Sequence, residues 1–220
     1  MKYLFNHILK IIIEIIFPEF CIGCNKLNTL LCSRCFEKLE YVQFKINDKG
    51  RANYLDTISC CCYYHGLAKK IIHELKYKSV VNVGLIVAQI MYYSCTLPKC
   101  DLVSYIPMHQ KKIGKRGFNQ SKIIAIELAR LLNLPIAKLL IKSKNTQSQM
   151  SLKSIKDRQM NIIDSIKLNA KVKKETVCKY KSILLIDDVF TSGTTLNYSA
   201  KVLKEFGFKH IHAACFLLRN

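Results

Sequence analysis

Residues 183–196 read ILLIDDVFTSGTTL. The four large apolar residues Ile183 to Ile186 have no polar face, which is typical of a central strand in a parallel sheet covered on both sides. Asp187 and Asp188 follow, and the run Thr191-Ser192-Gly193-Thr194-Thr195 then opens a predicted helix. The segment therefore predicts an acidic pair and a hydroxyl-rich loop at the carboxyl edge of a sheet, where α/β proteins bind ligands.

The loop after the acidic pair predicts a site for a sugar phosphate. Backbone N–H groups at the start of a helix attract an anion. Gly193 allows the backbone a close approach, and the four neighbouring Ser and Thr hydroxyls add hydrogen-bond donors. The carboxylates of Asp187 and Asp188 are acceptors suited to vicinal hydroxyls. A phosphate on one side and a diol on the other describe a ribose 5-phosphate.

Three rival interpretations of this segment differ in the pattern they need. A P-loop NTPase needs G-x-x-x-x-G-K-[ST], and a Rossmann dinucleotide site needs G-x-G-x-x-G, and neither run occurs in the chain. A cluster of helix caps without a ligand is the structural alternative. Capping alone rarely uses five such residues together with two acids, so we favour the ligand site.

The remaining pattern from about Ser59 onward alternates strands with helices. This order predicts an α/β fold with a mostly parallel sheet flanked by helices. A polar, irregular stretch at 41–58 separates it from the N-terminus, so we expect a small N-terminal module over 1–58 and the α/β domain over 59–220. The expected strands are 59–65, 101–108, 182–187 and 210–218, and the expected helices are 67–77, 80–94, 118–134 and 195–207.

Two CxxC pairs, Cys21/Cys24 and Cys32/Cys35, lie seven residues apart. Each CxxC supplies two sulfurs to one tetrahedral metal, so the pairs together predict a closed four-cysteine site with a structural zinc ion. Redox-active cysteines and an iron–sulfur cluster are the alternatives that the spacing leaves open.

The length, composition, charge and cysteine count of the chain limit the class of protein. The chain has 220 residues, of which 50% are hydrophobic, so it can bury a core. Its formal charge of +20 fits a polyanionic partner, but only 6 of its 35 basic residues are arginines, and a solvated lysine-rich surface explains the charge as well. The odd count of 11 cysteines argues against a secreted disulfide framework and for a reducing cytoplasm.

The N-terminal stretch 1–17 is apolar, but its uninterrupted runs are too short to span a bilayer. We expect no transmembrane segment here, and instead a helix that packs on the body of the protein, on a partner or on a membrane surface. Phe17-Pro18-Glu19-Phe20 lacks the small residues of a signal cleavage site.

The acidic pair together with the hydroxyl-rich loop 191–195 closely resembles the ribose-phosphate signature of type I phosphoribosyltransferases. Further blocks resemble the ComF competence-protein family in order along the chain: the N-terminal CxxC pairs, Leu75-Lys76-Tyr77, Ile106-Pro107-Met108-His109 with 115–120 (KRGFNQ), and Thr146, Gln149, Leu152, Arg158 and Asn161. Lys112 and Lys142 stand where arginine is usual in that family, and lysine cannot form a bidentate guanidinium clamp.

The resemblance implies bound 5-phosphoribosyl 1-diphosphate (PRPP) with Mg²⁺. Asp187 and Asp188 would hold the ribose hydroxyls, and 191–195 the 5-phosphate. Lys115 and Arg116 would neutralise the diphosphate, with Lys76 as a further candidate and the polar segment 142–161 as a lid. For a reaction at the sugar, the resemblance implies Asp187, Asp188 and Arg116 as the catalytic residues, acting by electrostatic stabilisation.

Three functions remain open from the sequence. The resemblance implies a cytoplasmic protein of DNA uptake or utilisation that handles single-stranded DNA together with a competence helicase or uptake machinery. The alternative is an active phosphoribosyltransferase with an unidentified acceptor, of the purine or pyrimidine salvage type. The third is a PRPP-responsive regulator without turnover.

Overall fold

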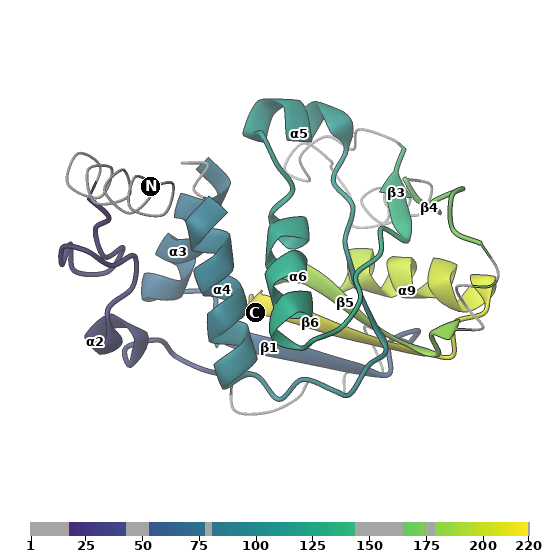
Figure 1. The fold of residues 1–220 in the computed structure, drawn as a ribbon, viewed down its shortest axis with the longest axis horizontal. Helices are drawn as coiled ribbons and strands as arrows, with labels where there is room; N and C mark the ends of the chain where they lie inside the picture. Colours follow the sequence, from purple (N-terminus) through teal and green to yellow (C-terminus); the bar gives the residue numbers. More distant parts are fainter. Residues whose placement is uncertain are drawn as a thin grey trace, which may run out of the picture.

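The computed structural model describes residues 18–42, 53–77, 81–143, 165–173, 175 and 179–219. Within these residues the chain forms a sheet with helices on both sides (Figure 1). The helices and strands in chain order are α2 (Ser33–Phe36), β1 (Thr57–Tyr63), α3 (Gly66–Tyr77), α4 (Val81–Ser94), β2 (Leu102–Tyr105), α5 (Gln110–Arg116), α6 (Gln120–Leu131), β3 (Leu140–Lys142), β4 (Ile166–Leu168), β5 (Ser182–Phe190), α9 (Thr194–Phe206) and β6 (His210–Leu218).

The main sheet has the order β1-β6-β5-β2, and every pairing in it is parallel. β5 lies in the interior of this sheet, between β6 and β2. Its residues 183–186 are buried on both faces, as their unbroken apolar run predicts. The connection from β5 through α9 to β6 brings the start of α9 to the carboxyl end of the sheet. The parallel sheet flanked by helices confirms the expected α/β fold.

Two apolar clusters cover the two faces of the sheet. The helices α3, α4 and α6 pack on one face, and α9 packs on the other together with the antiparallel pair β3–β4 (Figure 1). α4 and α6 approach closely at Gly84, where an added Cβ would lie 2.5 Å from Cγ2 of Ile123. This close contact fixes the position of α6, whose first residues reach the acidic pair on β5.

The structure differs from the expected elements in three places. β5 continues to Phe190, because Val189 and Phe190 still pair with the end of β6. Helix α5 and the pair β3–β4 were not expected: α5 is only seven residues long, and β3 and β4 have three residues each, too few to show a period. Residues 144–161 of the expected lid and the expected N-terminal helix lie outside the described residues.

Within the part of the chain that the structure describes, no helix has the length and apolar character needed to cross a bilayer.

Asp56 ties the segment before β1 to the start of β6. Its Oδ2 accepts hydrogen bonds from the backbone N–H of Ile211 at 2.7 Å and from Nζ of Lys204 at 3.0 Å. Burial opposes ionisation of Asp56, but the Ile211 N–H and Lys204 outweigh it and hold its pKa below the ordinary value.

We expect Asp56→Asn to lower the free energy of unfolding by about 1 kcal/mol, because a charge-assisted acceptor is lost at a carboxylate one-third exposed to solvent. A carboxylate with a depressed native pKa stabilises the fold above its unfolded pKa of 3.8 and loses that contribution as the pH falls through the native value. Urea unfolding at pH 7 and near pH 3 measures both. Glu205→Gln, which removes an exposed carboxylate of α9, is the control, and an equal effect of the two variants at pH 7 contradicts this assignment.

Candidate functional site

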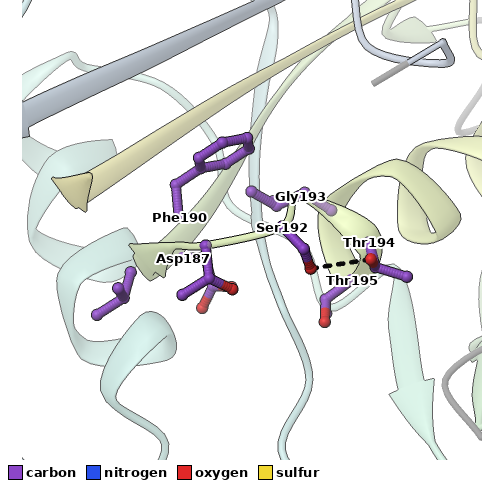
Figure 2. A pocket seen from close by; sticks show the side chains of 9 residues that line it. Asp187, Phe190, Ser192, Gly193, Thr194 and Thr195 are labelled. Atoms are coloured by element: carbon purple, nitrogen blue, oxygen red, sulfur yellow. Dashed lines mark hydrogen bonds between the residues drawn. The ribbon is translucent and has the colours of Figure 1, made fainter. Parts of the chain in front are cut away.

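The hydroxyl-rich loop between β5 and α9 lines an open pocket. Residues 191–195, Asp187, Val189, Phe190 and Leu196 form its wall. In Figure 2 the carboxylate of Asp187 and the hydroxyls of Ser192 and Thr195 lie on the same side of the loop, and the ring of Phe190 points away from them. The sequence-predicted loop and one of the two acids therefore come together around one pocket.

Gly193 sets the shape of this loop. Its φ of +71° lies in the left-handed region, which residues with a Cβ rarely adopt. Gly193 is also the N-cap of α9, and no side chain caps the helix start. The first helical amides therefore have no intrahelical acceptor and are available to an anion. The hydroxyls of Ser192 and Thr194 at this helix start are hydrogen-bonded to each other at 2.9 Å, so that one of them donates to the other.

Asp187 is held by its neighbours on two elements. Its Oδ1 accepts hydrogen bonds from Oγ of Ser121 on α6 and from the backbone N–H of Asp188, each at 2.9 Å. Burial and the adjacent Asp188 charge raise the pKa of Asp187 to about 7, although Ser121 and the Asp188 amide act against this rise. A carboxyl group at the pocket wall that titrates near neutrality can both bind a hydroxyl and exchange a proton.

Asp188 points to a different partner. Its Oδ2 lies 2.7 Å from Nζ of Lys76 at the end of α3, and both side chains are largely buried. Asp188 does not line the pocket as the structure stands. The structure thus places Lys76 against an acid, whereas the sequence analysis considered it for the diphosphate.

Helix α5 and strand β3 carry a group of basic side chains that interact with one another. Burial, then the nearby Lys112, lowers the pKa of Lys142, and Asp187 acts in the opposite sense. Burial and Arg116 lower the pKa of Lys112. Lys142 is therefore close enough to interact with both Lys112 and the pocket acid.

Lys115 and Arg116 occupy the last turn of α5, which ends at Gly117 in the left-handed conformation. Neither residue lines the pocket. Of the sequence-predicted set, the structure therefore brings Asp187 and 191–195 together and leaves these two cations beside Lys112.

Ser121 was missed by the sequence analysis. It directly follows the KRGFNQ block at 115–120. A serine in the first turn of a helix, however, gives no sign of a partner 66 residues away. Asn119 anchors this helix start, because its Nδ2 donates to the carbonyl of Ile106 at 2.9 Å. The position of Ser121 next to that anchor is the one local sign of its role.

The four predicted cysteines form a cluster. The Sγ atoms of Cys21, Cys24, Cys32 and Cys35 all lie within 4.8 Å of one another. Sγ of Cys32 lies 3.7 Å from that of Cys21 and 3.6 Å from that of Cys24. Four sulfurs about 2.3 Å from one tetrahedral metal are about 3.8 Å apart, so the cluster fits a metal ion of this kind.

The pKa values of two of these thiols also fit a site for a cation. Burial opposes ionisation of Cys21, but the backbone N–H groups of Cys32, Cys24 and Gly23 outweigh it and lower its pKa to about 6. Burial, followed by the neighbouring thiols, raises the pKa of Cys35 to about 12. Cys21 thus ionises readily, whereas a bound cation would be needed to ionise Cys35.

Gly23 makes room for this cluster, since a Cβ there would lie 2.6 Å from Sγ of Cys35.

A family model described as the phosphoribosyl transferase domain matches residues 115–220. Competence protein F of Haemophilus influenzae is 27% identical over 204 residues, covering 87% of this chain and 86% of that protein. DNA utilization protein YhgH of Escherichia coli K12 is 24% identical over 66% of this chain and 64% of its own length. Competence protein ComFC of Bacillus subtilis is 30% identical over 46% of this chain and 38% of its own length. The chain thus spans less than two thirds of the last two relatives.

Among solved structures, the glutamine PRPP amidotransferase of B. subtilis in complex with ADP and GMP is 19% identical, with a TM-score of 0.38 over 61% of this chain and 25% of that one. A structure described as the allosteric regulatory enzyme of purine biosynthesis has a TM-score of 0.37 and 18% identity, covering 61% of this chain and 24% of that one. Neither similarity adds to the assignment.

The parallel sheet, the acidic strand end and the glycine-hinged loop define a phosphoribosyltransferase-like domain, which here carries an N-terminal four-cysteine module. Over most of its length the chain is similar to Competence protein F, and over about half of it to ComFC.

We expect Ser121→Ala to raise the pKa of Asp187 further, because the hydroxyl that stabilises the carboxylate is lost. Titration of the aspartate carboxyl carbons by NMR measures this change. Ser59→Ala is the matched control, since Ser59 is also a buried serine but donates to the carbonyl of Thr96. An unchanged titration of Asp187 in Ser121→Ala would show that the two side chains are not bonded.

Proposed function

We propose that this chain binds PRPP with Mg²⁺ and acts in DNA uptake or utilisation as a ComF-type handler of single-stranded DNA. The observation that carries the PRPP assignment is the pocket in which a partly buried acid faces a hydroxyl-rich helix start. The amides and hydroxyls of 191–195 receive the 5-phosphate, and Asp187 receives a ribose hydroxyl. Asp188 binds a second ribose hydroxyl when the Lys76 side chain turns away from Asp188 toward the ligand.

The cations of α5 and β3 supply the place for the diphosphate. Lys112 and Lys142 are both partly buried with depressed pKa values, and a bound polyanion relieves their mutual repulsion. Lys115 and Arg116 extend the same positive region. Mg²⁺ would supply charge neutralisation of the diphosphate, with the acids of β5 as the nearby oxygen ligands.

The part in DNA uptake is supported by the relatives, which are named as competence and DNA utilization proteins. A formal charge of +20 fits a nucleic-acid backbone as partner. A competence helicase or other uptake machinery is the proposed protein partner.

The ten cysteines in the described residues form no disulfide with one another, which fits the cytoplasm as the place of action. Peripheral contact with the membrane is part of the same proposal.

Catalysis of phosphoribosyl transfer is the second candidate function. It is favoured by the pKa of about 7 at Asp187, because a carboxylate at that value is poised to accept a proton from an incoming nucleophile. Pyrophosphate release in the presence of nucleobases tests this candidate.

We expect Asp187→Asn and Asp188→Asn each to weaken PRPP binding by about 10- to 100-fold, because each removes charge-assisted acceptors for ribose hydroxyls or magnesium. Isothermal titration calorimetry with PRPP and Mg²⁺ measures the affinity. Glu37→Gln, an exposed charge change in the cysteine module, should bind as the unaltered protein does. Unchanged affinity in both aspartate variants would refute the site.

For the cysteine cluster we propose a structural zinc ion. We expect about one zinc per chain by elemental mass spectrometry, lost together with thermal stability in Cys32→Ser, because three thiolates hold zinc less tightly than four. Cys100→Ser, which alters a cysteine outside the cluster, should keep its zinc. Iron with a visible charge-transfer absorption, or no metal at all, would contradict the zinc assignment.

A further inference from the structure

Aromatic and cationic side chains gather where β1 and β6 end. We call the set Tyr63, Tyr64, His65, Lys69 and Arg219 the Tyr64 surface. Tyr63 is the last residue of β1, and Arg219 directly follows β6. Because both strands are parallel to β5, the Tyr64 surface lies at the same edge of the sheet as the pocket.

Two cations are held against one aromatic ring. Cζ of Arg219 lies 5.2 Å from the ring centroid of Tyr64, and Nζ of Lys69 lies 5.9 Å from it. Both distances are within the range of cation–π attraction. The cationic side chains are exposed to solvent, whereas the Tyr64 ring is partly buried against the core. The ring therefore fixes two positive charges at the surface without neutralising either of them.

The residues on either side of Tyr64 form a ring contact of their own, with Tyr63 packed against the core on the α9 side of the sheet and Tyr64 against the core on the α3 side. The rings of Tyr63 and His65 are stacked, with their centroids 6.1 Å apart and an angle of 11° between their planes. The side chain of His65 is 50% exposed, and its Nε2 lies 3.0 Å from Oε2 of Glu40. Glu40 thus holds the edge of the imidazole and leaves its flat faces free of that contact. A planar group can continue this stack.

The Tyr64 surface adjoins the sugar-phosphate pocket. Tyr63 pairs in register with Leu218, and Leu218 pairs with Phe190. The backbone N–H of Arg219 donates to the carbonyl of Phe190 at 2.8 Å, and Phe190 directly precedes the loop 191–195. Two strand spacings of about 4.8 Å separate β1 from β5. The stacked rings are therefore about 10 Å across the sheet edge from the start of the loop.

Packing alone explains Tyr63 and Tyr64 but not the rest of the set. The two partly buried tyrosines contribute to the cores on the α9 side and the α3 side of the sheet, respectively. His65, Lys69 and Arg219 are exposed, and ordering such side chains costs conformational entropy. A stacked, half-exposed ring beside two fixed cations matches the chemistry of a single strand, whose bases stack on aromatic rings while its phosphates meet positive charges. A duplex offers no unstacked base to such a ring.

We propose that the Tyr64 surface binds single-stranded DNA, with a base stacked on His65 and neighbouring phosphates at Lys69 and Arg219. This inference rests on the proposed role in handling DNA, and it adds the place of contact, next to the PRPP pocket. A strand bound there runs along the carboxyl edge of the sheet and reaches the mouth of the pocket.

The test measures binding of a fluorescein-labelled oligothymidylate by fluorescence anisotropy at several salt concentrations. We expect Lys69→Gln/Arg219→Gln to weaken binding about tenfold and to reduce the slope of log K against log salt by about 1.4, since each lost phosphate contact on a single strand removes about 0.7. We expect His65→Ala to weaken binding about fivefold with little change in that slope, because stacking is not an ionic contact.

Lys181→Gln/Lys209→Gln is the matched control. Lys181 and Lys209 are exposed and precede β5 and β6, at the opposite edge of the sheet, and the change in net charge is the same. Binding of PRPP by calorimetry serves as the check that each variant is folded. If the control weakens DNA binding as much as the Lys69/Arg219 variant, the Tyr64 surface is not the contact, although the role in DNA handling stands. If the unaltered protein binds no single-stranded DNA, the proposed function itself fails.

Discussion

The placement of two carboxylates near the end of the central strand is the constraint on which the site depends. Asp187 sits on β5 between neighbouring strands, where burial disfavours its charge, and it remains in place because Ser121 and the amide of Asp188 donate to it. Asp188 is compensated separately by Lys76. The two partners come from α6 and α3, which pack on the same face of the sheet. The position of these helices therefore sets the geometry of the acids, and the close approach of α4 to α6 at Gly84 is part of the site's support.

The cysteine module is connected to the same support. Leu67 at the start of α3 packs against the cysteine cluster, and Asn82 at the start of α4 donates to Glu19 in the module. Tyr41 forms a bridge with Cys62 on β1. A metal ion bound by the four sulfurs would steady the segment against which the start of α3 rests.

The sequence predicts the parts of this protein whose signals are local. The apolar run 183–186 identifies the central strand, the loop 191–195 identifies the pocket, and the two CxxC pairs identify the cluster. It does not predict the contact of Ser121 with Asp187, because that contact joins residues far apart in the chain through helix packing. It offers Lys76 as a further candidate for the diphosphate but does not predict the contact of Lys76 with Asp188, because a lysine in a helix shows its charge but not its partner.

A crystal structure of the protein with PRPP and Mg²⁺ tests the central claim most directly. The account predicts the 5-phosphate at the amides of 191–195, at the start of α9, and the ribose hydroxyls at Asp187 and Asp188, with Lys76 moved from the acid. A structure in which PRPP binds elsewhere, or in which Asp188 keeps its contact with Lys76 while Asp187 faces no ligand oxygen, would contradict it.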